Sequence, residues 1–296
     1  MATNVLLLGS TGVLGSQVLR ELSKEEAITL TAAGREIPEV YANSKTKFLT
    51  LDVGTFLSGQ DVLKFREYDV VVNCIGAIKQ KGFSQSEMYC INSIFPKLIA
   101  LEVKNSNTKV LNFSTDCVFT GIAQDVYDEN RTHDARDAYG FSKSLGEIKQ
   151  ENIFNIRCSF VGNEKKSNFS LLSWFRSQKP NAVISGYSRQ FWNGLGNVQY
   201  AKMIRSIVAE NCFDIPNSLN LIPKDYVSKF ELLDLFRNSF NRLDIKVIED
   251  DQAPFIYRVL STAYPEVNEK LWKLAGYEQP ATIEMMIREV ANEASV

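Results

Sequence analysis

The sequence predicts an α/β protein in which helices cover both faces of a doubly wound, parallel sheet, with a smaller α/β lobe at the C-terminal end. Apolar runs rich in β-forming residues alternate with helix-period segments through the first half of the chain, which is typical of βαβ units. A glycine-rich segment connects the first run to the first helix. The length of 296 residues, about twice that of a common domain, leaves room for a second lobe.

The alternation defines the elements expected in the first domain, residues 1–160. The strands are expected at Val5–Leu8, Ile28–Ala32, Phe48–Leu51, Val70–Cys74, Val110–Phe113 and Ile153–Ile156. The helices between them are expected at Val13–Leu22, Val62–Arg66, Met88–Val103 and Ala138–Gln150. Continuous apolar strands of this kind are buried on both faces, so we predict a parallel sheet between two helical layers.

Residues 161–296 are expected to form mainly the substrate-binding lobe, either separate from the first domain or interleaved with it. The regular alternation stops after Arg157, and aromatic residues become denser. Two further helices are predicted at Val227–Asn238 and Asn268–Ala275, the second ended by Gly276 in a C′-like position. Because no linker or repeat separates the two parts, we expect an intimate interface between them.

Composition and charge exclude several classes of protein. Lys and Arg number 33 against 35 Asp and Glu, and the net charge of −2 offers no attraction for nucleic acid. No apolar run approaches the roughly 20 residues of a membrane span, and the N-terminus lacks the pattern of a secretory signal. The 5 cysteines are odd in number and scattered, as in a reducing compartment. We therefore expect a cytoplasmic protein that binds neither nucleic acid nor a membrane.

His133 is the single histidine of the chain. A histidine-rich metal site therefore cannot form, and we expect no metal. A Ser-His-Asp triad would have to use this residue, but its polar surroundings in the sequence favour a solvated position in a loop.

The segment Gly9–Gly15 has the spacing GxxGxxG between the first strand and the first helix. Such a turn brings backbone N–H groups and a helix N-terminus onto a pyrophosphate, and its last glycine lets the helix pack on the strand. We interpret it as a dinucleotide site, with a merely tight strand-to-helix turn as the alternative. The residues expected to contact the cofactor there are Gly9, Thr11, Gly12, Val13, Leu14 and Gly15.

Arg35 follows the second strand, at the place that distinguishes the two nicotinamide dinucleotides. An arginine there suits the 2′-phosphate of NADP(H), whereas an acid binds the ribose hydroxyl of NAD(H). We therefore expect NADP(H), with NAD(H) as the alternative if Glu36 binds the ribose. After the third strand come Asp52 and Val53, also expected at the cofactor. Asp52 either accepts a hydrogen bond from the adenine amino group or caps the next turn.

Tyr139 and Lys143 form a YxxxK element at the start of a predicted helix, and i,i+4 spacing places the phenol and the ammonium on one face. Tyrosine titrates at about pH 10, but a neighbouring ammonium favours the phenolate. We expect Lys143 to lower the pKa of Tyr139 in this way and to hold the nicotinamide ribose. The pair then suits proton transfer to a carbonyl that receives a hydride, although taken alone it also fits a surface pair.

Thr115 lies in the segment Ser114–Gly121, which follows an apolar strand at the edge where open parallel sheets bind ligands. Its hydroxyl is expected to polarise the substrate carbonyl, because that hydrogen bond strengthens as negative charge develops. Asp116 is a candidate substrate ligand. Alternatively, Ser114 and Asp116 close the turn through hydrogen bonds to the backbone.

Four segments, taken in order, resemble those of a known family: GSTGVLG at 9–15, NCIG at 73–76, STDCVFTG at 114–121 and YGFSK at 139–143. Together they resemble the extended short-chain dehydrogenase/reductase family and, within it, the dTDP-4-dehydrorhamnose reductases. The resemblance implies a Rossmann fold, a nucleotide-sugar substrate and a nicotinamide cofactor.

The same resemblance implies roles for individual residues. The catalytic set is Thr115, Tyr139 and Lys143. Asn73 and Gly76 are expected to line the cofactor groove, with Asn92 supporting the catalytic geometry, and the pair Asp128 and Glu129 is similar to an acidic pair of the family.

Two departures from the family pattern bear on the reaction and the sugar. Cys117 stands where the related 4,6-dehydratases carry a glutamate that works in elimination, so dehydration is disfavoured. The segment Phe191–Leu195 differs from the Gly-x-Pro-Thr type of the reductases. Trp192 and Asn193 in it are expected either to bind the nucleotide sugar or to belong to an aromatic core.

The expected function is NADPH-dependent reduction of the 4-keto group of a nucleotide-linked 6-deoxy sugar, in surface-polysaccharide or deoxysugar biosynthesis. The alternatives are an epimerase of the same fold and a non-catalytic NADP-binding regulatory subunit. The nucleotide sugar is the expected partner, and the sequence is compatible with a homodimer.

Overall fold

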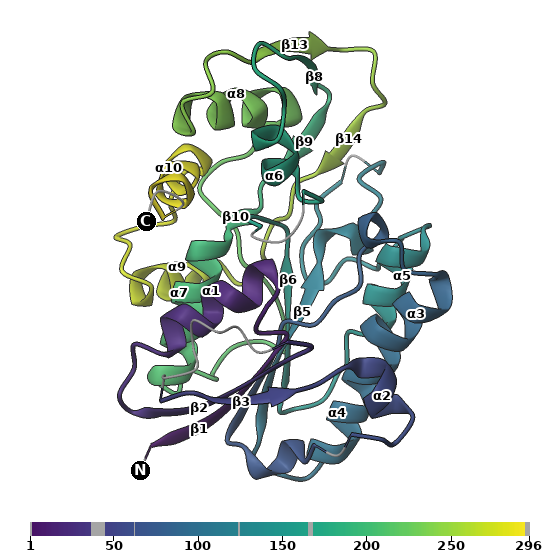
Figure 1. The fold of residues 1–296 in the computed structure, drawn as a ribbon, viewed down its shortest axis with the longest axis vertical. Helices are drawn as coiled ribbons and strands as arrows, with labels where there is room; N and C mark the ends of the chain where they lie inside the picture. Colours follow the sequence, from purple (N-terminus) through teal and green to yellow (C-terminus); the bar gives the residue numbers. More distant parts are fainter. Residues whose placement is uncertain (1, 37–44, 62, 124, 165–167, 294–296) are drawn as a thin grey trace.

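The computed structural model describes residues 2–36, 45–61, 63–123, 125–164 and 168–293. Its centre is a seven-stranded sheet with the order β11-β6-β5-β4-β1-β2-β3, in which every pair of neighbours is parallel (Figure 1). The strands are β1 (Thr3–Leu8), β2 (Ile28–Gly34), β3 (Lys47–Thr50), β4 (Val70–Asn73), β5 (Lys109–Thr115), β6 (Ile153–Cys158) and β11 (Ser218–Asn220). The predicted doubly wound α/β class is confirmed.

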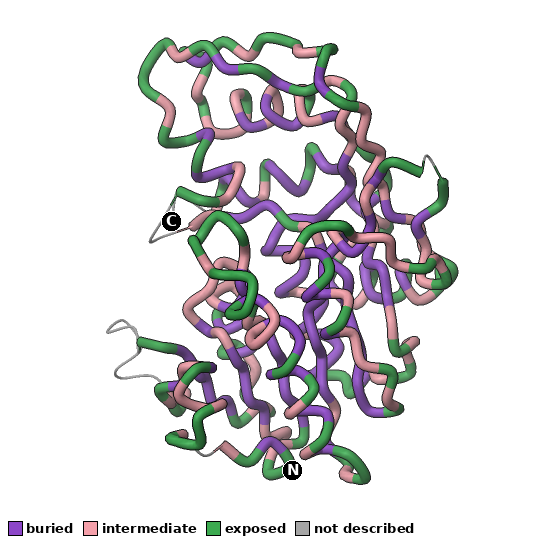
Figure 2. The backbone as a smooth tube through the Cα atoms, turned by 90° about the vertical axis from the view of Figure 1, so that its right-hand side faces the viewer, coloured by how far each residue is buried: buried purple, intermediate pink, exposed green. Residues whose placement is uncertain are grey.

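Two helical layers cover this sheet, because alternate side chains of its strands point to opposite faces. On β1, Val5 and Leu7 belong to one hydrophobic core and Leu6 and Leu8 to the other. The helices that border the first core are α1 (Val13–Leu22), α7 (Asn197–Ala209) and α9 (Pro265–Leu274), while α4 (Phe95–Val103) borders the second. Figure 2 shows the buried backbone running through the middle of the molecule.

The strand predictions agree with the structure, and helix α1 has the predicted bounds. The helix predicted at Val62–Arg66, however, is wrong. The structure instead has a short helix α2 (Val53–Leu57) and a 3-10 helix over Phe65–Glu67. Val62 itself lies outside the described residues. The Asp52 carboxylate starts α2 by accepting a hydrogen bond from Gly54 N at 2.8 Å.

Two other predicted helices are interrupted or shorter than expected. The stretch predicted at Met88–Val103 consists of α3 (Gln85–Tyr89), a π-helix over Cys90–Ile94 and then α4. The helix predicted to reach Gln150 is α5 (Ala138–Leu145) and ends at Gly146. Packing against neighbouring elements decides these helix boundaries. The periodicity of apolar residues does not show this packing.

The smaller lobe contains the elements at the top of Figure 1. They are α6 (Leu171–Arg176), β8 (Val183–Tyr187), β9 (Gln190–Trp192), β12 (Val227–Ser228), α8 (Lys229–Ser239), β13 (Lys246–Asp250), β14 (Ile256–Arg258) and α10 (Ile283–Glu293). Strand β9 lies between β12 and β14, β8 pairs with β13, and β7 (Phe160–Val161) pairs with β10 (Leu195–Gly196). Helix α7 and strand β11 return to the large sheet, so the later part of the chain contributes to both lobes.

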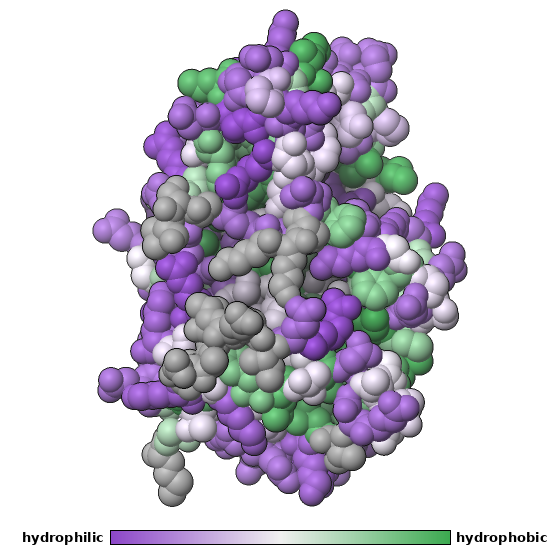
Figure 3. All heavy atoms as spheres, viewed as in Figure 1, coloured by the Kyte–Doolittle hydropathy of each residue, from purple (hydrophilic) through white to green (hydrophobic). Residues whose placement is uncertain are grey.

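The late helices differ from their predicted bounds by a few residues. Helix α8 starts at Lys229, after the capping box of Ser228 and Glu231, and α9 ends just before the left-handed Gly276. Among the described helices, none is both long enough and apolar enough to cross a bilayer. Hydrophilic side chains cover much of the face seen in Figure 3.

A ladder of buried asparagines crosses the sheet beneath α5. Asn73, Asn112 and Asn155 are register partners on β4, β5 and β6. Asn73 Nδ2 donates to Asn112 Oδ1, and Asn112 Nδ2 donates to Asn155 Oδ1, each at 3.0 Å. Asn112 Nδ2 also donates to the carbonyl of Gly146 at 3.0 Å, which ties the end of α5 to the sheet.

A buried ion pair fixes the chain just after α5. Arg157 on β6 donates from Nε and Nη2 to the two carboxylate oxygens of Glu147, both at 2.9 Å. Ser114 Oγ on β5 donates to Glu147 Oε1 at 2.6 Å. Because buried charges require such partners, the carboxylate holds α5 in one position over the sheet.

His133 packs against this ion pair, so the expectation of a solvated loop residue is wrong. Its Nδ1 lies 2.7 Å from Ser144 Oγ, and its Nε2 lies 3.6 Å from Glu147 Oε2. Burial lowers the pKa of His133, and Glu147 opposes this shift, while Arg157 adds to it. The imidazole is therefore held in its neutral form.

We predict that His133 lowers the stability of the folded protein in mild acid. The pKa of His133 in the folded state is lowered below its unfolded value of about 6.5, so the unfolded chain binds the proton more strongly. Between about pH 8 and about pH 5.5, the free energy of unfolding should fall by up to about 1 kcal/mol more in the wild type than in His133→Asn. Urea unfolding at both pH values measures this, and equal losses in the two proteins would contradict it.

Candidate active site

The glycine-rich turn after β1 leaves no space for larger residues. A Cβ on Gly15 would lie 2.1 Å from the carbonyl oxygen of Gly9, so only glycine lets α1 pack so closely. Gly9 has φ +77°, and a Cβ there would lie 3.0 Å from the backbone of Cys74. The turn is therefore pressed between the carboxyl ends of β1 and β4, where the strand order reverses.

The N-terminus of α1 could bind an anion through its backbone N–H groups. Gly12 is its N-cap and no side chain caps it, and its first turn carries no acidic residue. Val13, Leu14 and Gly15 therefore present backbone N–H groups and the positive end of the helix dipole. The described residues fit the pyrophosphate of a dinucleotide at this place.

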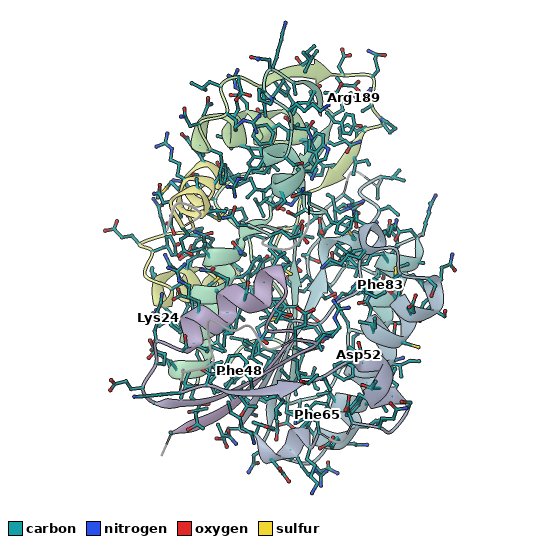
Figure 4. All side chains as sticks on the ribbon, viewed as in Figure 1. Lys24, Phe48, Asp52, Phe65, Phe83 and Arg189 are labelled. Atoms are coloured by element: carbon teal, nitrogen blue, oxygen red, sulfur yellow. The ribbon has the colours of Figure 1, made fainter. Side chains whose placement is uncertain are left out.

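The residues expected around the adenosine end lie along the neighbouring strand ends. Arg35 is exposed directly after β2, and Gly34 before it lies close to Thr11, since a Cβ on Gly34 would be 3.4 Å from that side chain. Asp52 caps α2, and Val53 is buried. Figure 4 shows Asp52 beside α2.

Asn92 holds the segment after β4 against α5. From the π-helix, its Oδ1 accepts from Ala77 N at 2.9 Å and its Nδ2 donates to Ala77 O and to Ser142 Oγ, each at 3.0 Å. Gly76, just before, faces Lys143, because a Cβ on it would lie 3.1 Å from Nζ. The π-helix thus places Asn92 between Ala77, in the segment after β4, and Ser142 on α5.

Thr115, Tyr139 and Lys143 converge at the carboxyl end of β5. Asp137 caps α5 by accepting from Gly140 N at 2.9 Å, which sets the start of the helix that carries Tyr139. The Tyr139 phenol lies near Thr115, whose hydroxyl acts to lower the pKa of that phenol. Lys143 Nζ donates to the carbonyl of Phe113 at 2.9 Å, two residues before Thr115. The three side chains therefore all lie near the carboxyl end of β5.

Burial decides the protonation of these groups. It raises the pKa of Tyr139, with Cys117 adding to the rise and Thr115 opposing it. It also lowers the pKa of Lys143. The expectation that Lys143 lowers the pKa of Tyr139 toward neutrality is therefore wrong for the chain without ligand. In this arrangement Tyr139 is a protonated phenol, and burial makes it a weaker acid than a free tyrosine.

Asp116 and Cys117 directly follow Thr115 in the segment Ser114–Gly121, which is called the catalytic turn below. Asp116 is buried and its Oδ1 accepts from Thr115 Oγ1 at 3.2 Å. Burial, followed by the charge of Asp116, raises the pKa of the Cys117 thiol to about 12. A thiol held neutral in this way does not serve as a base at neutral pH.

The two lobe residues expected to bind substrate are partly engaged within the protein. Trp192 is buried, and its Nε1 donates to Ser159 Oγ at 2.7 Å. Asn193 Nδ2 donates to Leu260 O at 2.7 Å, while its Oδ1 accepts from Leu260 N at 2.8 Å. The amide of Asn193 thus joins the segment after β9 to the segment after β14.

The acidic pair is also used inside the protein. Glu129 accepts hydrogen bonds from the backbone N–H groups of Asn220 and Ala263, each at 2.7 Å. Asp128 Oδ1 accepts from Asn130 N at 2.9 Å. The contacts of Glu129 join the loop before α5 to the C-terminal part of the chain, whereas that of Asp128 stays within the loop.

Arg258 and Lys229 are close to the catalytic turn and were not expected from the sequence. Arg258, at the end of β14, donates from Nη1 to Cys117 Sγ at 3.5 Å and from Nη2 to Thr120 O at 3.3 Å. The Nζ of Lys229, at the start of α8, lies 5.9 Å from the centre of the Trp192 ring. No motif surrounds either residue in the sequence. The pairing of β14 with β9 brings Arg258 there, and the pairing of β12 with β9 brings Lys229.

Known proteins of related sequence and fold agree with this architecture. The spore coat polysaccharide biosynthesis protein SpsK of Bacillus subtilis (strain 168) is 29% identical over 191 residues, 62% of this chain and 62% of that protein. The match therefore spans less than two thirds of the length of that relative.

Solved structures show the same fold over nearly the whole chain. A dTDP-4-dehydrorhamnose reductase from Clostridium acetobutylicum has a TM-score of 0.70 at 17% identity, covering 99% of this chain and 100% of that one. The Bacillus anthracis enzyme of that name, solved with NADP, gives the same values. A UDP-glucuronic acid 4-epimerase from Bacillus cereus, solved with NAD, has a TM-score of 0.72 at 15% identity, covering 98% and 96%.

The family model described as RmlD substrate binding domain matches residues 3–209, which include the glycine-rich turn, the catalytic turn and α5. Because this match covers most of the chain, the protein belongs to the RmlD substrate binding domain family, in keeping with the resemblance of its motifs to the extended short-chain dehydrogenases/reductases.

Proposed function

We propose that the protein is an NADPH-dependent reductase of the 4-keto group of a nucleotide-linked 6-deoxy sugar. The observation that carries this proposal is the placement of Thr115, Tyr139 and Lys143 near the carboxyl end of β5, in a parallel sheet whose strand β1 leads into the uncapped N-terminus of α1. A binding subunit without turnover has no need of a buried proton donor there. The name of the relative SpsK supports a place in polysaccharide biosynthesis.

The reduction divides between the cofactor and these side chains. The bound dinucleotide supplies a hydride to the carbonyl carbon. Thr115 donates a hydrogen bond to the carbonyl oxygen, which gains negative charge as the hydride arrives. Tyr139 then gives its proton to that oxygen, so the ketone becomes an alcohol and the phenol becomes a phenolate. The ammonium of Lys143 would hold the nicotinamide ribose.

Elimination is a poor alternative for the catalytic turn. Its base would have to be Cys117, and the raised pKa of that thiol keeps it protonated. NADP(H) is proposed as cofactor because Arg35 follows β2 and because the Bacillus anthracis reductase was solved with NADP. The Bacillus cereus epimerase was solved with NAD, so NAD(H) is the alternative.

The proposal is tested by adding NADPH and a dTDP-4-keto-6-deoxy sugar to the purified protein and following the loss of NADPH absorbance. The expected result is stoichiometric oxidation of NADPH with formation of the 4-hydroxy sugar. Absence of turnover with a panel of nucleotide keto-sugars would contradict it. Tightly bound NAD together with interconversion of two sugars, without net oxidation, would indicate an epimerase instead.

We predict that Tyr139→Phe lowers kcat by about 10² to 10⁴ fold, because the proton donor is lost. The affinity for NADPH should change little, since the phenol is not needed to hold the phosphates. Steady-state kinetics and cofactor titration measure the two effects separately. Tyr187→Phe on β8 is the matched control and should keep the wild-type rate, since that tyrosine is exposed in the lobe. A Tyr139→Phe protein with an unchanged kcat would show that another group donates the proton.

We predict that Arg35→Ser weakens NADPH binding by roughly tenfold or more and leaves NADH binding nearly unchanged, because only NADPH carries the 2′-phosphate. Fluorescence titration of both dinucleotides measures this. Arg288→Ser, an exposed arginine on α10, is the control for a general change in charge. Equal affinities of Arg35→Ser and wild type for NADPH would assign cofactor choice to another residue.

A further inference from the structure

Strand β13 lies at the outer end of the smaller lobe with one edge open. It pairs in parallel with β8 on one side, and within the described residues no strand pairs with it on the other side. Figure 1 shows β13 at the tip of the molecule, with no other segment beyond it. An open edge of this kind presents unpaired backbone groups to which another strand can bind.

The pairing with β8 decides which backbone groups of β13 face the open edge. Lys246 N donates to Ala182 O at 2.9 Å, and at the other end of the strand Asp250 O accepts a hydrogen bond from the β8 side at 3.1 Å. Successive residues of a paired strand turn their N–H and C=O groups alternately toward the neighbour and away from it. The backbone groups of Val247 and Glu249 therefore point to the open edge.

The outer face of the β8–β13 pair carries exposed apolar side chains. In the register of the pair, Val183, Tyr187 and Ile248 belong to one face, and Val183 is 62% and Ile248 45% exposed. The other face packs against α8, since a Cβ on Gly186 would lie 2.8 Å from Phe230 Cα. Parallel strands are usually covered on both faces, so this uncovered apolar face indicates a surface that binds another chain.

The charges along β13 fit an antiparallel copy of the same strand. Its sequence is Lys-Val-Ile-Glu-Asp, with a cation at the start and an acid at the end. When Ile248 lies opposite Ile248 of such a copy, Lys246 lies opposite Asp250. Val247 then lies opposite Glu249, so the two residues whose backbone groups face the edge form the hydrogen-bonded pairs of the ladder. Charge and backbone pairing therefore match in one register.

We propose that β13 pairs edge to edge with β13 of a second copy of the chain, which joins two β8–β13 pairs into one four-stranded sheet about a two-fold axis. The axis passes beside Ile248, and Lys246 of each copy lies opposite Asp250 of the other. A two-fold contact uses both open edges, so it gives a closed dimer and no fibre. The interface is small and rich in charge, so the dimer depends on protein concentration and is weakened by salt.

Sedimentation velocity of the full chain, from micromolar to hundreds of micromolar protein, tests the proposal. The wild type should shift from monomer to dimer over this range. Lys246→Glu and Asp250→Lys each place like charges opposite one another twice in the dimer, so each should weaken self-association by roughly tenfold or more. Lys270→Glu, at an exposed position on α9, is the matched control and should associate like the wild type.

The register is tested by mixing the two weakened variants. In an equimolar mixture of Lys246→Glu and Asp250→Lys, both cross-strand pairs of a mixed dimer have opposite charges, so dimer should reappear. Glu249→Pro removes an N–H group at the open edge and none that bonds to β8, so it should also weaken the dimer. Melting temperatures check that each variant is folded.

Three outcomes would overturn the proposal. They are a wild type that stays monomeric over the whole range, a dimer that neither charge reversal weakens, and a mixture that associates no better than its components. The proposed reaction does not enter these outcomes. A monomer that reduces a keto-sugar would refute the dimer and keep the reductase, whereas a dimer of the expected kind without turnover would do the opposite.

Discussion

The close packing of α5 against the end of β5 is the constraint on which the candidate site depends. Gly140 and Gly146 make it possible, because a Cβ on Gly140 would lie 2.1 Å from Cys117 O and one on Gly146 would lie 1.9 Å from Asn92 O. With both backbones this near, Lys143 reaches the carbonyl of Phe113. A larger residue at either glycine would separate the phenol and the ammonium from the strand end that carries the hydroxyl.

Buried polar groups hold this arrangement in place. The asparagine ladder and the Glu147–Arg157 pair join α5 to β4, β5 and β6 through hydrogen bonds that water does not weaken. Each donor and acceptor in such a network is expensive to leave unpaired, so alternative positions of α5 are disfavoured. Polar groups thus take the place of apolar packing beneath α5, and they fix the orientation of Tyr139 and Lys143.

The exclusion of water also sets the chemistry of the site. It keeps the phenol of Tyr139 and the thiol of Cys117 protonated, so this part of the site lacks a thiolate base. The smaller lobe contributes cations to the same region and is joined to it by Asn193 and Glu129. The two lobes are therefore joined next to Thr115, Tyr139 and Cys117.

The sequence by itself determined the α/β class, the six N-terminal strands, α1 with its glycine turn, and the residue types Thr115, Tyr139 and Lys143, because strand burial, helix period and the steric need for glycine act over short stretches of chain. The tertiary structure alone decided the π-helix at Asn92, the environment of His133, the raised pKa of Tyr139 and the approach of Arg258 to Cys117. Desolvation and contacts between separate elements depend on what packs over a group, and no local pattern in the sequence shows this.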